Sequence, residues 1–226
     1  VTVLEKVYGP FFVGLFEPVF SSLCEGLKVK VKVVGKTDNN WVELEVSGED
    51  EKVALRYLGQ KFGLAPSSVD EVKKFSTVKG RIVISEKDED GLQVDIGISS
   101  PKFYGAYIPL QTLRAQIADG KNLSYKQITD SFCLCENLPL EVKIVSDMEN
   151  EEGLVRAEFS ETQLSEFAQW LHAYVDRLIV FGAPRSNVEH AVKESKHTRD
   201  IVKINSLGLL EHAVVCKLGT DAVGLI

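Results

Sequence analysis

Residues 79–98, KGRIVISEKDEDGLQVDIGI, read as two β-strands joined by an acidic loop. Every second residue from Leu92 to Ile98 is apolar, and Gln93 and Asp95 lie between them. An apolar period of two is typical of a strand that buries one face and exposes the other. We therefore expect a hairpin whose outer face carries Gln93 and Asp95.

Three further strands are predicted after this hairpin, and a helical segment (110–120) separates the first of them from the other two. The strands are AYIPL (106–110), LPLEVKIVSD (138–147) and GLVRAEFS (153–160). Five short strands with one helical insertion are the count expected of a small, partly open barrel.

The first 74 residues predict the order strand, helix, strand, strand, helix. The segment LKVKVKVVG (27–35) alternates between valine and lysine, as a strand with one buried face does. Ser47 is expected to cap the second helix and Gly63 to end it. This order favours two helices packed on one face of a small antiparallel sheet.

A third segment begins with Ser160, which is expected to cap a helix over 161–178. A strand, a helix and a pair of strands follow, so the order strand, helix, strand, strand repeats that of residues 2–47. The predicted domains are an N-terminal α/β unit (1–74), a barrel (77–164) and a C-terminal α/β unit (165–226). The final run has no polar tail, and the sequence leaves open whether the natural chain continues past Ile226.

The middle segment resembles the S1-type oligonucleotide-binding domain over roughly residues 77–164. The resemblance rests on KGRIV, DGLQVDIG, AYIPLQTL, LPLEVKIVSD and GLVRAEFSE, in that order. The whole chain also resembles a conserved archaeal family of unknown function, in the stretches YIPLQTLRAQIADG, DRLIVFGA and CKLGTDAVGLI. These resemblances imply an α+β protein in which a central five-stranded S1/OB-like β-barrel is flanked by two small α/β units, and they imply no established activity.

The stacking positions of an S1 domain are not aromatic in this chain. Where S1 domains carry exposed aromatic or histidine side chains on the second and third strands, this sequence has Asp90, Gln93 and Pro109. Stacking contributes roughly 1–3 kcal/mol per base, so its loss weakens binding at this face. The acidic hairpin would also repel phosphates.

Residues 177–203 carry the strongest basic signal, because cations outnumber carboxylates there. A helix that starts at GAPRSN could offer free N–H groups to an anion. We expect phosphate contacts from Arg185, Lys193, Lys196 and Arg199. Around the barrel, the candidates for nucleic-acid contact are Lys79, Arg81, Phe103, Tyr104 and Arg114. For both sets the alternative is an ordinary role as solvated charges or core aromatics.

Signals for a metal, a cofactor or catalysis are weak. His190, Glu194 and His197 fall at spacings of four and three on one helix face, but nothing in the sequence specifies a further ligand, so no metal is expected. Cys133 and Cys135 are expected to be small buried side chains. The sequence contains no nucleophile elbow, P-loop or GxGxxG, so we expect no cofactor and no enzyme activity.

The composition excludes some classes of function. The 226 residues carry a formal net charge of −7, which argues against a protein that coats nucleic acid by its overall charge. No apolar run approaches the roughly 20 residues of a membrane span, so no membrane contact is expected. Four cysteines without a CxxC motif and a start without signal-peptide features favour the reducing cytoplasm.

These observations favour a non-catalytic binding protein with single-stranded RNA as its ligand, in translation or RNA metabolism. The alternative is a protein–protein adaptor whose barrel has lost nucleic-acid binding and which takes an acidic protein partner. The sequence leaves the oligomeric state open.

Overall fold

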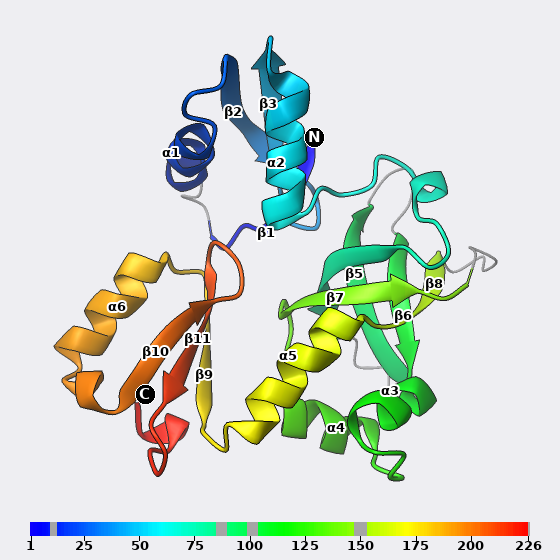
Figure 1. Cartoon of the computed structure of the whole chain (residues 1–226), viewed down its shortest axis with the longest axis vertical. Coiled ribbons are helices and arrows are strands. Elements are labelled where there is room, and N and C mark those ends of the chain that lie inside the picture. Colours follow the sequence, from blue (N-terminus) through cyan, green and yellow to red (C-terminus); the bar gives the residue numbers. More distant parts are fainter. Residues whose placement is uncertain (10–12, 85–89, 99–103, 147–152, 226) are drawn as a thin grey trace. The chain divides into compact units, whose positions relative to one another are not determined.

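The computed structural model describes residues 1–9, 13–84, 90–98, 104–146 and 153–225. They form two compact units, residues 1–163 and residues 164–226, each described separately below. The protein is α+β, as predicted, with a closed five-stranded barrel between two small α/β segments of the chain (Figure 1). The division into domains 1–74, 77–164 and 165–226 remains a prediction.

The N-terminal segment is a three-stranded antiparallel sheet in the order β1-β3-β2 with two helices. Val31 and Val33 are buried while Lys30 and Lys32 are exposed, so the predicted alternation is confirmed. Phe20 of α1 meets Phe62 of α2 edge to face, with ring centroids 5.6 Å apart, so both helices lie on the same face of the sheet. The elements are β1 (Thr2–Lys6), α1 (Val13–Leu23), β2 (Val29–Lys36), β3 (Trp41–Gly48) and α2 (Glu51–Phe62).

The start of α2 differs from the prediction. Its N-cap residue is Asp50 rather than Ser47, because β3 continues to Gly48. The Asp50 carboxylate makes no cap hydrogen bond and instead accepts one from the backbone N–H of Lys28 (2.9 Å). The predicted end at Gly63, with φ of 85°, is confirmed.

The barrel closes in the order β4-β5-β6-β8-β7, with β4 pairing to both β5 and β7. All pairs are antiparallel except β6 with β8, which is parallel, and the arrangement is consistent with an OB-like fold. The barrel is therefore closed rather than partly open. Its strands are β4 (Thr77–Val83), β5 (Gly91–Ile98), β6 (Tyr104–Pro109), β7 (Pro139–Ile144) and β8 (Leu154–Phe159).

The helical insertion between β6 and β7 contains two helices, α3 (Leu110–Ile117) and α4 (Tyr125–Phe132), where the sequence predicted only the first. A capping box starts α4: Ser124 Oγ accepts from the N–H of Gln127, and the Gln127 side chain accepts from the N–H of Ser124. Leu113 of α3 and Ile128 of α4 are fully buried, so the insertion extends the barrel's core.

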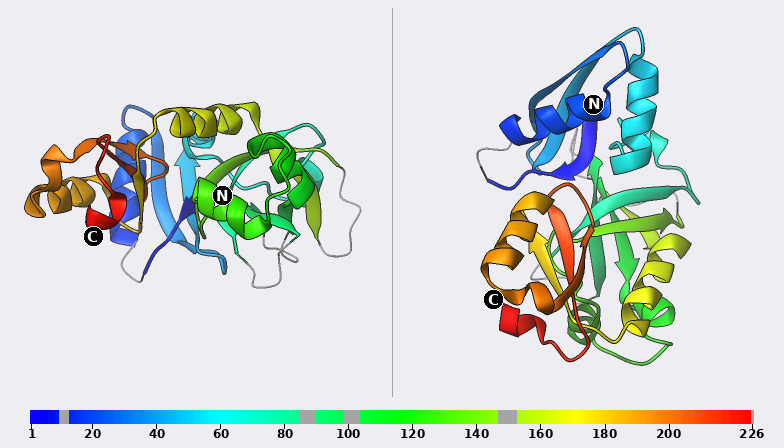
Figure 2. Two further views of the ribbon diagram at one scale, coloured as in Figure 1. Left: turned by 90° about the horizontal axis from the view of Figure 1, so that it is seen from below. Right: turned by 60° about the vertical axis from the view of Figure 1, so that its left-hand side comes forward.

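The unit formed by residues 164–226 contains a second three-stranded antiparallel sheet, β10-β11-β9. As in the N-terminal sheet, the last strand in the chain lies in the middle, so the predicted resemblance in element order extends to the topology. Helix α6 covers one face of this sheet (Figure 2). The elements are α5 (Glu161–His172), β9 (Arg177–Phe181), α6 (Arg185–Glu194), β10 (Ile201–Ser206), β11 (Glu211–Cys216) and the short 3-10 turns η2 (His197–Arg199) and η3 (Ala222–Leu225). Another 3-10 turn, η1 (Val69–Glu71), lies before the barrel.

Gly97 on β5 lies where the barrel packs against the N-terminal segment. Its φ is 89°, and a Cβ there would stand 2.6 Å from the Ala65 Cβ and 2.7 Å from the Leu4 Cδ2. We expect Gly97→Ala to lower the free energy of unfolding by about 1–3 kcal/mol, through overpacking and backbone strain. Urea unfolding would measure this, with Gly120→Ala as the control: its φ is also positive (73°), but nothing lies within 4 Å of the added Cβ. If Gly97→Ala lowers the free energy of unfolding no more than the control does, the contacts of the added Cβ with Ala65 and Leu4 do not destabilise the protein.

Candidate nucleic-acid interface

The outer face of β5, where OB folds bind single strands, is largely covered by the chain itself. Asp95 points away from the barrel core, as predicted, yet only 1% of it is exposed. Gly97 is also buried, and Gln93 is half-buried. The covering residues come from β1 and β3, so the part of the face that the sequence placed in solvent is an internal surface of residues 1–163.

A hydrogen-bonded ion pair fills this internal surface. The Asp95 Oδ2 accepts from the Lys6 Nζ (3.2 Å) and from the Trp41 Nε1 (2.9 Å), while its Oδ1 accepts from the N–H of Gly97 (2.8 Å). The Lys6 Nζ also donates to the Asn39 carbonyl (2.6 Å) and lies 4.2 Å from the centre of the Trp41 ring. Burial lowers the pKa of Lys6, and the neighbouring Asp95 carboxylate opposes that shift.

A second buried ion pair lies beside the first. The Arg81 guanidinium donates to Glu5 Oε2 (3.2 Å), and both side chains are about as buried as core residues, at 5% and 4% exposed. Arg81 also lies 5.8 Å from the Trp41 ring centre. This corrects the expected role of Arg81: its charge is used inside the protein, so it offers no surface to a phosphate.

The open part of the barrel face centres on Tyr107, a residue that the sequence analysis did not select. Tyr107 is half-buried on β6, paired in register with Gln93 of β5 and with the exposed Arg156 of β8. Its ring lies over Gly91, where a Cβ would come within 2.7 Å of it. The alternation of AYIPL, with Ala106 and Ile108 buried, was the signal that would have placed Tyr107 outside.

The other barrel candidates have mixed outcomes. Lys79 is half-buried and its Nζ donates to the Lys61 carbonyl (3.2 Å), and the Arg114 Nε donates to the Leu123 carbonyl (2.7 Å). Both cations therefore already have an internal acceptor. Tyr104 is half-buried at the start of β6, and Phe103 lies outside the described residues.

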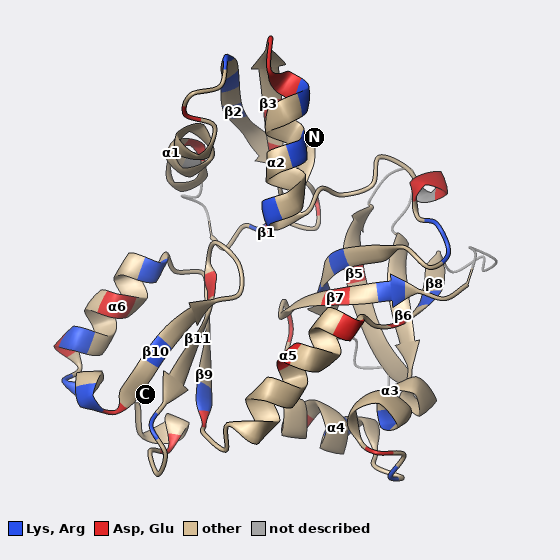
Figure 3. Ribbon diagram, in the orientation of Figure 1, with Lys and Arg blue, Asp and Glu red and all other residues tan. Residues whose placement is uncertain are grey.

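The basic residues of α6 and η2 are exposed, as the phosphate-binding hypothesis needs. Arg185, Lys193, Lys196 and Arg199 are all exposed, as is Lys203 on β10. Figure 3 marks the lysine and arginine positions along α6 and β10 in blue. Arg185 pairs with Glu189 one turn on, at 2.8 Å. Among the residues that the structure describes, no carboxylate lies within 4.0 Å of the other four cations. The strand register places Lys203 on the face of the sheet that α6 does not cover. We call Lys193, Lys196 and Arg199 the α6–η2 cluster.

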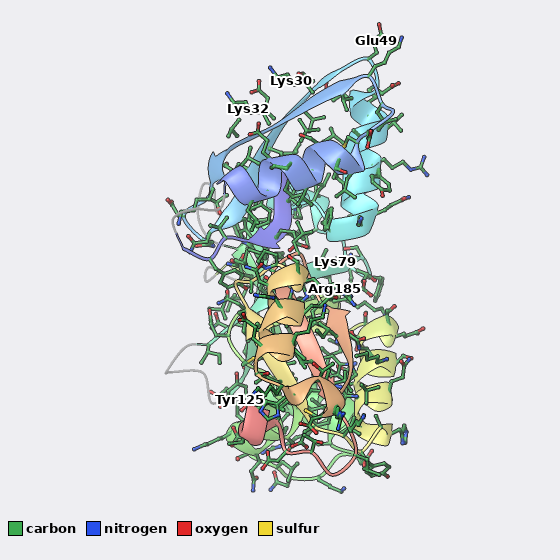
Figure 4. The ribbon with its side chains drawn as sticks, turned by 90° about the vertical axis from the view of Figure 1, so that its left-hand side faces the viewer. Lys30, Lys32, Glu49, Lys79, Tyr125 and Arg185 are labelled. Carbon is green, nitrogen blue, oxygen red and sulfur yellow. The ribbon has the colours of Figure 1, made fainter. Side chains whose placement is uncertain are left out.

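A second exposed basic row lies on β2 in the other unit. Lys30 and Lys32 project outward from the N-terminal sheet, and Lys28 nearby pairs with Glu49 at 2.7 Å (Figure 4). Lys30 and Lys32 alternate with buried valines on this strand, so the row is the solvent face of an amphipathic strand. It provides a matched comparison for the α6–η2 cluster.

The histidines of α6 and η2 do not converge. His190 contacts Glu194 (3.2 Å), whereas His197 contacts Asp200 (3.0 Å). Within the described part of the chain, no three His, Cys, Asp or Glu side chains are grouped so that they could hold a metal ion. In the same residues, no helix has the length and apolar character needed to cross a bilayer.

Family models match nearly the whole length of the chain. Family models match in succession: the DUF2110 N-terminal domain over residues 1–68, the DUF2110 central domain over 72–171 and the DUF2110 C-terminal domain over 175–226. Among solved structures, the chain is similar to a small protein from vaccinia virus (Wisconsin strain), with 10% sequence identity, a TM-score of 0.26 and coverage of 39% of this chain and 88% of that chain. No curated protein matches the sequence.

Proposed function

Because the chain belongs to the DUF2110 family and contains a closed OB-like barrel, we propose that it is a non-catalytic protein that binds single-stranded RNA through the α6–η2 cluster. The observation that carries the proposal is the exposure of these three cations without a carboxylate partner in the described residues. Cations of this kind can replace the counterions of a phosphate backbone, which is the main source of affinity for nucleic acids. A role in translation or RNA metabolism would follow from such binding.

Binding of this type has a recognisable salt dependence. Three phosphate contacts to a single strand give a slope of log K against log salt concentration of about −2. Since phosphates carry no base identity, little sequence preference is expected. The covered face of β5 supports the same conclusion, because it removes much of the surface on which an OB fold reads bases.

Charge reversal tests the proposal. We expect Lys193→Glu with Arg199→Glu to weaken binding to a single-stranded RNA oligonucleotide by more than about tenfold at low salt, because two attractive contacts become repulsive. Fluorescence anisotropy over a salt series would measure the affinity and the slope. Lys30→Glu with Lys32→Glu changes the net charge equally and is the matched control, which should bind much as the wild type does.

Three outcomes would contradict the proposal in different ways. Equal losses in both charge-reversed proteins would show that only overall charge matters. An unchanged affinity in the α6–η2 variant, with a loss of about 1–3 kcal/mol for Tyr107→Ala, would place base stacking on the barrel instead. Absence of RNA binding by the wild type at low salt would leave the adaptor function.

The adaptor function has one observation of its own in its favour. Trp41, Lys6 and Asp95 close the part of the barrel face next to Gly97, as expected of a barrel that no longer holds a strand there. In that case the α6–η2 cluster would bind an acidic protein segment. Polyglutamate and RNA can be compared as competitors for the α6–η2 cluster. The adaptor function predicts that polyglutamate competes, whereas RNA binding predicts that RNA competes more strongly.

A further inference from the structure

Two cysteines lie together at the end of α4, and one of them is exposed. Cys133 is the C-cap residue of α4, with φ of 52°, and its backbone N–H donates to the Thr129 carbonyl. It is exposed, Cys135 is half-buried, and the other two cysteines, Cys24 and Cys216, are buried. The expectation that Cys133 and Cys135 are both small core side chains is therefore wrong for Cys133.

A tight turn brings the two cysteines close to each other. The N–H of Cys135 donates to the Cys133 carbonyl at 2.9 Å, which closes a three-residue turn around Leu134. Leu134 is 2% exposed and anchors the turn in the core. The loop is also joined to β4, because the N–H of Asn137 donates to the Ile82 carbonyl (2.9 Å). A turn of this kind favours the short Cα separation that a disulfide needs.

The two thiols also interact directly. The Cys135 thiol donates a hydrogen bond to the Cys133 sulfur, and this bond lowers the pKa of Cys133 to about 7. The same bond, together with burial, raises the pKa of Cys135. The exposed sulfur is therefore the better nucleophile near neutral pH, while its neighbour holds a proton until the first sulfur has reacted.

We propose that Cys133 and Cys135 form a dithiol–disulfide exchange site that reacts with low-molecular-weight disulfides. The Cys133 thiolate attacks one sulfur of the disulfide, so that a mixed disulfide forms and one thiolate leaves. Cys135 then gives its proton to solvent and attacks the Cys133 sulfur, which forms the Cys133–Cys135 disulfide and releases the second thiolate. The two protein thiols lose two electrons, and the small disulfide gains them.

This site is independent of the proposed RNA binding, since its residues belong to the barrel insertion and not to the α6–η2 cluster. Oxidised glutathione is a suitable probe. The full chain is incubated with it, alkylated, digested and examined by mass spectrometry. We expect the peptide with Cys133 and Cys135 to lose two hydrogens, while Cys24 and Cys216 stay reduced and react with the alkylating reagent only after unfolding.

Variants separate the two roles. Cys135→Ser should stop after the first step and accumulate one glutathione on Cys133, whereas Cys133→Ser should gain neither glutathione nor a disulfide. Cys135→Ala removes the hydrogen-bond donor that Cys135→Ser keeps. At pH 7, Cys133 of the Cys135→Ala variant should react with oxidised glutathione about threefold more slowly than Cys133 of the Cys135→Ser variant. Without the hydrogen bond a smaller fraction of Cys133 is thiolate, and the greater nucleophilicity of that thiolate offsets this loss only in part.

Two results would overturn the proposal. One is a wild-type protein in which both cysteines remain open to alkylation after exposure to oxidised glutathione. The other is a wild-type protein that keeps glutathione on Cys133 while Cys135 stays reduced. Equal reaction rates for Cys135→Ser and Cys135→Ala would show that the hydrogen bond does not activate Cys133.

Discussion

Replacing Asp95 by alanine is expected to lower the free energy of unfolding by about 3–5 kcal/mol, the cost of breaking a buried ion pair by removing one partner. The reason is that two buried hydrogen-bond donors remain after the substitution. The Lys6 Nζ and the Trp41 Nε1 both donate to the Asp95 carboxylate, and after the substitution a buried cation and a buried indole N–H would lose that acceptor. The only other hydrogen bond that the structure gives the Lys6 ammonium, among the described residues, is to the Asn39 carbonyl.

Urea unfolding followed by the fluorescence of Trp41 would measure this loss, because Trp41 contacts the substituted residue. The sequence has two tryptophans, so Trp170→Phe leaves Trp41 as the sole reporter. Asp90→Ala is the control: it removes an exposed carboxylate from the same hairpin and should change the stability by less than about 0.5 kcal/mol. A loss below about 1 kcal/mol for Asp95→Ala would mean that water reaches Lys6.

The double variant Lys6→Met with Asp95→Ala refines the result. If the cost arises from an uncompensated buried cation, removal of that cation should restore part of the lost stability, so the double variant should be more stable than Asp95→Ala alone. A double variant that is less stable than the single one would instead point to lost packing against Trp41.

Phe167→Ala is expected to cost a similar amount, about 3–5 kcal/mol, in the other unit. Phe167 is 2% exposed on α5, and its ring meets that of Trp170 edge to face, with centroids 6.0 Å apart. Truncation removes an aromatic ring from a packed site and leaves a cavity. Hydrogen exchange of the backbone amides of α5 would report the loss at this helix.

The neighbouring position supplies the comparison for that experiment. Ala168 is exposed on the same helix, so Ala168→Ser should change the protection of α5 by less than about 0.5 kcal/mol. Equal protection of α5 in Phe167→Ala and in the wild type would show that burial of Phe167 does not stabilise this helix.

Most of the fold was predictable because period-two alternation is a local property. The valines and lysines of β2, and the apolar residues from Leu92 to Ile98 on β5, have the burial that the pattern predicts. The cap of α2 was not predictable in the same way. Both Ser47 and Asp50 suit an N-cap, and the choice depends on how far β3 remains paired with β2.

The candidate site was harder to predict from the sequence than the fold. Alternation predicts which side of a strand a residue occupies, but it does not predict which other residues cover that side. Asp95 is on the outer side of β5, as expected, but Lys6 and Trp41, 89 and 54 residues earlier, bury it. Arg81 is buried by the same long-range packing, with Glu5 as its partner 76 residues away. The exposed cations of α6 were predictable, because a polar helix face needs no distant partner.

The buried ion pairs also affect the order in which the chain matures during synthesis. A ribosome adds about 5–20 residues per second, so the 89 residues between Lys6 and Asp95 take about 4–18 s to make. Glu5 lacks its counter-ion until Arg81 has been made, and Lys6 lacks its own until Asp95 has been made, so both remain hydrated while the rest of the N-terminal sheet has already left the ribosome. Strand β1 is thus secured only after β4 and β5 have been made, and a nascent chain arrested before Arg81 should leave β1 open to a protease.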